Sequence, residues 1–159
     1  MFSWLTGTFA GKIIATIFVS MVPLIELRGA IPIGVGLGLD LVPTILLCIL
    51  GNMIPVPFII LFIRKIFALM RRLSPKLDGI VVKMENKAYS KKEILDKYKA
   101  LGLYILVAIP LPGTGAWTGS LVAALFDIRL KTAFPIIFAG VATAGLIIGL
   151  ITGGVVALI

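Results

Sequence analysis

The sequence predicts an all-α integral membrane protein with an inverted-topology repeat, in which each unit is a re-entrant helical hairpin followed by a full transmembrane helix. Three observations predict this class. Hydrophobic residues make up 60% of the 159-residue chain, whereas a soluble domain holds about 45–50%. Runs without a charged residue come in two lengths, one long enough to cross a bilayer and one about half as long. Basic residues gather in one internal segment, as in a cytoplasmic loop.

The first predicted repeat spans about 12–63 of what we expect to be a single membrane domain. Its charge-free runs at 13–25 and 29–39 are short. Because a helix rises about 1.5 Å per residue, each run covers about half of the hydrocarbon layer. The run 41–63 is long enough to cross. We therefore expect a hairpin that enters the membrane and returns on the same side, is closed by Asp40, and leads into a full span.

The segment 64–99 is a predicted cytoplasmic loop. It carries eleven of the 15 basic residues and four of the seven acidic ones, which leaves a net charge of +7. Ser74-Pro75 is typical of a helix start, and SKKE at 90–93 is typical of a capping box. We expect two amphipathic helices at the surface of the inner membrane, either solvated or in contact with anionic lipids. The positive-inside rule explains this charge better than nucleic-acid binding.

The second predicted repeat spans about 99–150. Its charge-free run 100–126 contains the letters IPLPGTG, whose prolines and glycines cannot continue a regular helix. The run therefore divides into half-length helices at 100–109 and 116–126. A second full span follows in the charge-free run after residue 131.

An offset of 87 residues aligns the two predicted repeats. It places Lys12 on Lys99 and Asp40 on Asp127. With the basic loop in the cytoplasm and the hairpins entering from opposite faces, 13 of the 15 basic residues lie inside. Inverted repeats of this kind hold their substrate near the midplane, between broken helices.

The motif PLIELRGAIP places two charges at the turning point of the first hairpin. Charges at this depth are costly and usually face a cavity or a partner. Arg28 could hold an anion such as a phosphate, helped by free N–H groups where Gly29 begins the next half-helix. Glu26 would then carry a proton. Alternatively, Glu26 and Arg28 form a structural ion pair that fixes the turn. Pro32 closes the motif and completes this part of the candidate site.

The facing motif, IPLPGTGAW, frees backbone groups that could coordinate a ligand. Thr114 adds a hydroxyl group, and the glycines allow close approach of the backbone. The alternative is a helix kink that packs against a neighbour. The candidate ligand-binding residues of this break are Pro110, Pro112, Gly113, Thr114 and Gly115.

Four further polar residues are weaker candidates for substrate contact. Asp40 and Asp127 are expected to close the two hairpins, where aspartate is a common turn residue. Arg129 could equally anchor the topology. Asn52 lies in an apolar helix and needs a partner, which could be a packing hydrogen bond or a substrate.

The chain lacks the side chains of a metal or redox site. It has no histidine and a single cysteine, Cys48, so we expect no disulfide, no metal and no other cofactor. We find no nucleophile–base pair and do not expect an enzyme.

Three stretches of the chain carry a family resemblance. They read ELRGAIPIGVGLG at 26–38, GN at 51–52 and PLPGTGAWTGSLVAALF at 110–126. These stretches resemble the family of small multidrug export proteins, which is similar to the broader DedA/VTT superfamily. The resemblance to DedA implies two re-entrant hairpins from opposite sides and transport of polyprenyl phosphate or related lipids. It also implies that membrane-embedded acids and arginines are essential.

Carried over by position, Glu26 and Asp40 match the acidic pair of that superfamily, and Pro112-Gly113 matches its proline–glycine break. DedA proteins also have arginines around the second break. Between Lys99 and Arg129 this chain has none, so anion recognition rests on Arg28.

These observations together predict a multi-pass transporter of the inner membrane that flips an anionic lipid such as polyprenyl phosphate, with Glu26 as the candidate for proton coupling. One alternative is proton-driven export of small cationic drugs at Glu26, which Arg28 would oppose by like-charge repulsion. Another is a scaffold that transports nothing. Because short hairpins cover a cavity poorly, we expect a homodimer among the membrane lipids.

Overall fold

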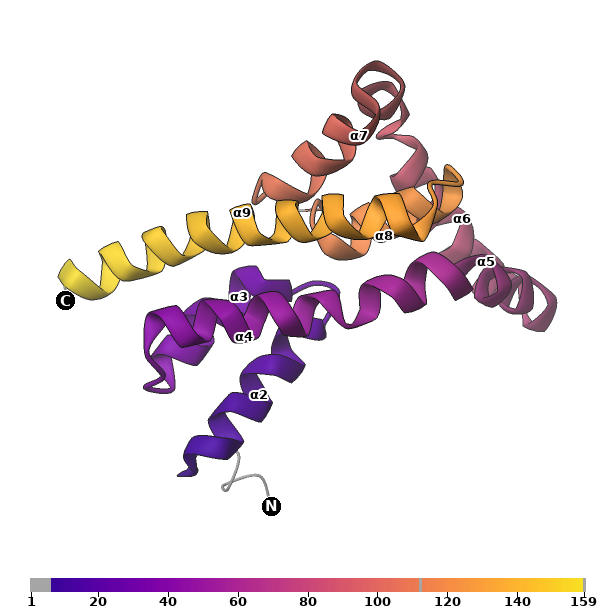
Figure 1. The fold of residues 1–159 in the computed structure, drawn as a ribbon. Helices are drawn as coiled ribbons and strands as arrows, with labels where there is room; N and C mark the ends of the chain where they lie inside the picture. Colours follow the sequence, from indigo (N-terminus) through magenta and orange to yellow (C-terminus); the bar gives the residue numbers. More distant parts are fainter. Residues whose placement is uncertain (1–6, 112, 159) are drawn as a thin grey trace.

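The computed structural model describes residues 7–111 and 113–158, which are helical apart from short connections. Helices α4 and α5 together (33 residues) and α9 alone (29 residues) are long and apolar enough to cross a membrane. Figure 1 shows them side by side, running in opposite directions. The helices are α2 (Phe9–Met21), α3 (Glu26–Gly36), α4 (Leu41–Met53), α5 (Pro55–Leu73), α6 (Pro75–Tyr89), α7 (Lys92–Ala108), α8 (Ala116–Leu125) and α9 (Leu130–Leu158).

The first two short helices, α2 and α3, confirm the half-length helices expected before Asp40, but the turn between them comes earlier than predicted. The N–H group of Glu26 donates to the carbonyl of Val22 at 2.9 Å, and Glu26 takes a positive φ of 50°. Helix α3 therefore begins at Glu26. The Gly29 N–H donates to the Ile25 carbonyl at 3.1 Å, so the expectation of a free N–H at Gly29 is wrong.

The predicted first span is bent and longer than its charge-free run. Helix α4 ends at Met53 and α5 begins at Pro55, because the prolines at 55 and 57 have no N–H to continue the helical hydrogen bonds. Helix α5 then runs to Leu73, ten residues past the charge-free run 41–63. A charged side chain ends an apolar run but does not end a helix.

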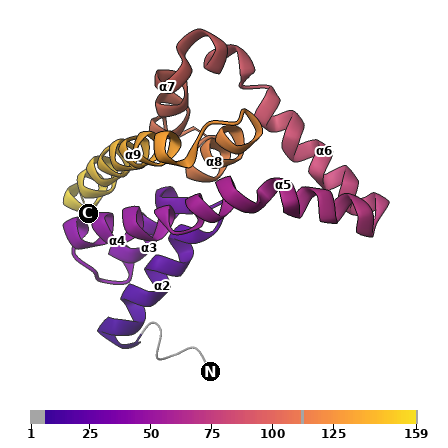
Figure 2. The ribbon, with the colours of Figure 1, turned by 45° about the vertical axis from the view of Figure 1, so that its right-hand side comes forward.

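After the end of α5, the rest of the basic segment forms two helices, as predicted. Ser74 caps α6, since its Oγ accepts a hydrogen bond from the Lys76 N–H at 3.3 Å. The capping box expected at 90–93 does not form: the Ser90 hydroxyl donates to the Lys87 carbonyl, which ends α6, and α7 begins at Lys92. Figure 2 shows α6 folding back from the end of α5 towards α8, and α7 returning to α9.

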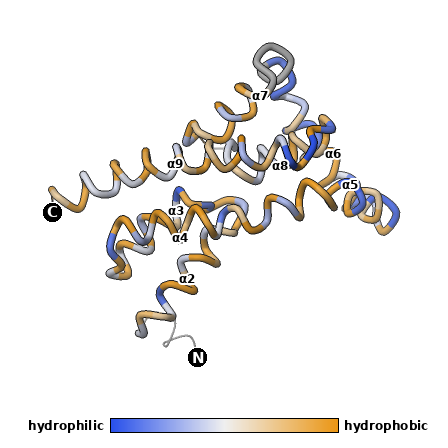
Figure 3. The backbone as a smooth tube through the Cα atoms, viewed as in Figure 1, coloured by the Kyte–Doolittle hydropathy of each residue, from blue (hydrophilic) through white to orange (hydrophobic). Residues whose placement is uncertain are grey.

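Polar and apolar residues separate along the molecule. Figure 3 shows hydrophobic residues along α4 and α9, and hydrophilic ones gathered where α5 meets α6.

Close contacts between helices depend on glycine. Val107 of α7 lies between Gly119 of α8 and Gly140 of α9, where an added Cβ would come within 2.5 and 2.7 Å of its side chain. These contacts hold α7 and α8 against α9, with the break between α7 and α8 beside the turn between α2 and α3.

Candidate functional site

The site is built around the break between α7 and α8. Helix α7 ends at Ala108 and α8 begins at Ala116, as the prolines and glycines predict. Gly113 and Gly115 take φ values of 81° and 119°, which are accessible to glycine at little cost. The break leaves carbonyl groups at the end of α7 and N–H groups at the start of α8 without helical partners. Pro112, a predicted site residue, lies outside the described residues.

Arg28, at the start of α3, satisfies the carbonyl side of this break. Its Nη2 donates to the Ile109 carbonyl at 3.2 Å and to the Thr114 hydroxyl at 2.8 Å, and its Nη1 donates to the Leu111 carbonyl. The carbonyl end of a helix carries partial negative charge. A guanidinium group, with five N–H donors in a planar fork, suits such a cluster of acceptors.

Glu26 satisfies the opposite side of the same break. Its side chain is buried (4% exposed), and its Oε1 accepts a hydrogen bond from the Trp117 N–H at 3.1 Å, in the first turn of α8. The N-terminus of a helix carries partial positive charge. Gly115 makes room for the carboxylate, because a Cβ there would lie 2.7 Å from its carbon atom. The Trp117 indole N–H also donates to the Met21 carbonyl at 3.0 Å.

The two charges of the first motif thus bind opposite ends of one broken helix. Among the ion pairs of the described residues, none joins Glu26 to Arg28. The two opposite charges still attract each other, so the alternative of a structural Glu–Arg pair stays a prediction. Their hydrogen-bond partners lie in the break between α7 and α8. We call this set of contacts, from Glu26 and Arg28 to residues 109–117, the latch.

A cavity of about 390 Å³ lies beside the latch. A second, mainly apolar cavity of about 140 Å³ adjoins it and shares four of its lining residues. The predicted site residues that line the larger cavity are Glu26, Arg28, Gly29, Pro110, Gly113 and Thr114.

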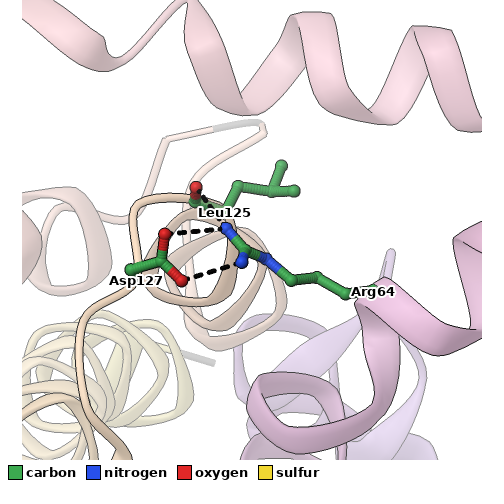
Figure 4. A network of polar contacts seen from close by, with 3 residues as sticks. All are labelled: Arg64, Leu125 and Asp127. Atoms are coloured by element: carbon green, nitrogen blue, oxygen red, sulfur yellow. Dashed lines mark hydrogen bonds and ion pairs between the residues drawn. The ribbon is translucent and has the colours of Figure 1, made fainter.

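The structure places the remaining candidates elsewhere. Asp127 forms an ion pair with Arg64 of α5, with Oδ1 2.8 Å from Nη1, and takes a positive φ of 56° at the α8–α9 turn (Figure 4). Arg64 also donates to the Leu125 carbonyl at 3.0 Å. Asp40 is exposed and precedes α4 without a side-chain hydrogen bond that caps the helix. Arg129 is exposed in the turn between α8 and α9. These three residues lie at helix connections and do not line the cavity.

Asn52 and Pro32 also lie outside this cavity. Asn52 is fully buried, and neither of its amide atoms has a hydrogen-bond partner within the described part of the chain. The predicted packing hydrogen bond is therefore not made there. Pro32 lies in a separate apolar groove between α3 and the end of α9.

Lys87 is a cavity residue that sequence reasoning missed. It comes from α6 and lines both cavities, with its Nζ 3.5 Å from where a Cβ on Gly113 would lie. No local pattern sets Lys87 apart from the other basic residues of segment 64–99. Only the return of α6 towards α8 brings it to the break.

Comparison with known families gives a match over most of the chain. The sequence model of the family described as "Putative small multi-drug export protein" matches residues 26–147. This range begins at Glu26 and contains both halves of the latch. No curated protein and no solved structure matches the chain. The family description implies a membrane transporter rather than an enzyme and supports multidrug export over lipid flipping. The wider DedA/VTT similarity stays a prediction.

Proposed function

The chain belongs to the small multi-drug export family, and from this premise we propose that it exports small amphipathic molecules through the cavity beside the latch. The proposal rests on one observation. The α2–α3 turn and the α7–α8 break meet beside two adjoining cavities, one lined by charged side chains and one mainly apolar. Binding sites in transporters are commonly formed by the ends of such discontinuous helices.

The proposed architecture is the inverted pair of hairpins. The long helices would cross the bilayer, and α2–α3 and α7–α8 would enter from opposite faces and meet at the latch. Two contacts support this arrangement. Lys12 lies beside the α3–α4 turn, 3.5 Å from the Cβ position of Gly38, and Arg64 pairs with Asp127 at the α8–α9 turn. The basic helix α6 then lies on the cytoplasmic side by the positive-inside rule, and its last turn reaches the cavity.

Charge in the cavity favours anionic or neutral amphiphiles over cations. Arg28 and Lys87 line it against one carboxylate, Glu26, which already accepts a hydrogen bond from Trp117. A cationic drug would meet two like charges there. The second candidate substrate is an anionic lipid such as polyprenyl phosphate, because it has, like a small anionic amphiphile, a charged group on an apolar chain. Glu26 is the candidate for proton coupling, because protonation would remove its charge from the start of α8.

Transport in proteoliposomes tests the function. We would compare an anionic dye with an alkyl chain, a cationic dye of similar size and a labelled polyprenyl phosphate, with and without a proton gradient. The substitution Arg28→Gln should abolish transport, whereas Arg129→Gln, a change outside the cavity, should not. Transport of the cationic dye alone would contradict our charge argument. Absence of transport for all three would favour the scaffold.

Cysteine labelling tests the arrangement. The only cysteine, Cys48, is fully buried, so a Cys48→Ala protein gives a clean background. We expect Lys12→Cys to react with an impermeant maleimide from the periplasmic side and Lys83→Cys only after the membrane is opened. Labelling of both from one side would rule out the inverted arrangement. The homodimer remains a proposal, which crosslinking in the native membrane would test.

A further inference from the structure

Lys87 carries an inference that deepens the proposed function and rests on it. Of the three charged side chains that line the larger cavity, Glu26 and Arg28 are engaged in the latch, although the buried Nε of Arg28 has no hydrogen-bond partner among the described residues. Lys87 differs from them. Within the described residues, no ion pair at contact distance and no hydrogen bond from its ammonium group is formed. Lys87 is exposed and attracts the carboxylate of Glu26 only through space.

Lys87 lies directly beside the break between α7 and α8. The residue lies two positions before the end of α6, and its Cε and Nζ are 3.3 and 3.5 Å from the Cβ position of Gly113. A side chain at residue 113 would crowd this lysine. The positive φ of Gly113 and the absence of a Cβ thus leave the ammonium group beside the break.

Lys87 also lies where the polar and apolar cavities meet. The residues that line both cavities are Pro23, Leu24, Lys87 and Thr118. Beyond them, the smaller cavity is lined by Ile59, Ile63, Met84, Trp117 and Leu121. A molecule whose anionic group binds Lys87 could therefore place an apolar chain against α5 and α8.

We propose that Lys87 binds the anionic group of the transported amphiphile, and that the apolar chain of the amphiphile lies in the adjoining cavity beside Trp117. The latch then holds the break in shape, and Lys87 provides the charge that selects the substrate. Lys87 would reach the site from a helix outside the two hairpins, so substrate selection would depend on the docking of α6 against α8. A solvated lysine of an ordinary cytoplasmic loop would have no such role.

Tryptophan quenching tests this assignment directly. The chain has two tryptophans, so a Trp4→Phe protein reports from Trp117 alone. We would titrate it in micelles with two probes that carry the same brominated alkyl chain, one a phosphate and one a trimethylammonium. We expect Lys87→Gln to weaken binding of the alkyl phosphate about tenfold, or about 1.4 kcal/mol, and Lys87→Arg to restore most of it. Lys83→Gln, one turn earlier on the same helix, should change nothing.

The possible results separate this inference from the proposed function. If the phosphate probe quenches Trp117 equally in wild type and Lys87→Gln, or if Lys83→Gln has the same effect as Lys87→Gln, the role of Lys87 is overturned while export stands. If wild type binds and transports no probe, the proposed function fails and the inference falls with it. Competition by a short alkyl phosphate and by polyprenyl phosphate then tells whether a small amphiphile or a lipid is the tighter ligand, and Lys87→Gln should weaken both.

Discussion

Substituting Gly115 by alanine should displace Glu26 and open one side of the latch. The new Cβ would lie 2.7 Å from the carboxylate carbon of Glu26, so the carboxylate has to move away from the Trp117 N–H. Losing a hydrogen bond to a charged group costs about 1.5–3 kcal/mol. The backbone at Gly115, with φ 119° and ψ −170°, lies in a region that alanine reaches only at an added cost of about 1–3 kcal/mol.

A double-mutant cycle separates these two costs. In a Glu26→Ala background no carboxylate remains to be displaced, so Gly115→Ala should cost only the backbone part. The coupling free energy between the two substitutions should therefore be about 1.5–3 kcal/mol. Gly38→Ala is the control, since Gly38 also has a positive φ (87°) but its Cβ position is near Lys12 and not Glu26. Its effect should add to that of Glu26→Ala without coupling.

The assay is unfolding by sodium dodecyl sulfate in mixed micelles, followed by far-UV circular dichroism, for the four proteins of each cycle. Equal destabilisation by Gly115→Ala in the presence and absence of Glu26 would refute the reasoning. It would mean that Glu26 does not hold the start of α8.

Three further substitutions test the other contacts by the same unfolding assay. Arg28→Lys keeps the charge but not the fork of donors, so it should destabilise by about 1.5–3 kcal/mol, whereas Arg129→Lys should have no effect; equal effects would contradict the role of Arg28. Asn52→Leu removes a buried amide without partners among the described residues and should be neutral or stabilise by up to about 2 kcal/mol; a large loss of stability would reveal a hidden partner. Asp127→Gly breaks an exposed ion pair worth about 0–1 kcal/mol but relieves a positive φ. The free energy of unfolding should therefore change by less than about 1 kcal/mol. A loss above about 2 kcal/mol would show that the contact with Arg64 contributes more than an exposed ion pair does.

Local signals in the sequence predicted the helices better than their ends. The half-length helices and the break at 109–115 follow from proline, glycine and the lengths of apolar runs, which act through the backbone itself. The bend at Ile54 also follows from two nearby prolines, although we expected one continuous span. The capping box at 90–93 failed because the Ser90 hydroxyl bonds backwards to Lys87 instead of forwards. Short polar motifs of this kind fit either end of a helix.

The candidate site was predicted in part. Six of its residues line one cavity, because the two breaks that contain them come together. Asp127 and Asp40 do not take part, since they lie at the helix connections, where the sequence already allowed a turn role. The arginine at the break between α7 and α8 is Arg28, which comes from α3.

The sequence by itself determined that this chain is apolar and helical. It also determined that Glu26 and Arg28 lie at one helix break and that backbone groups without helical partners lie at another, at 109–115. Each of these properties depends on neighbouring residues only. The tertiary structure decided that Glu26 and Arg28 bind opposite ends of the second break, 81 to 91 residues away along the chain, and that Lys87 joins them. A charge needs a partner inside a membrane, but which partner it finds depends on how distant helices pack, and no local pattern encodes that.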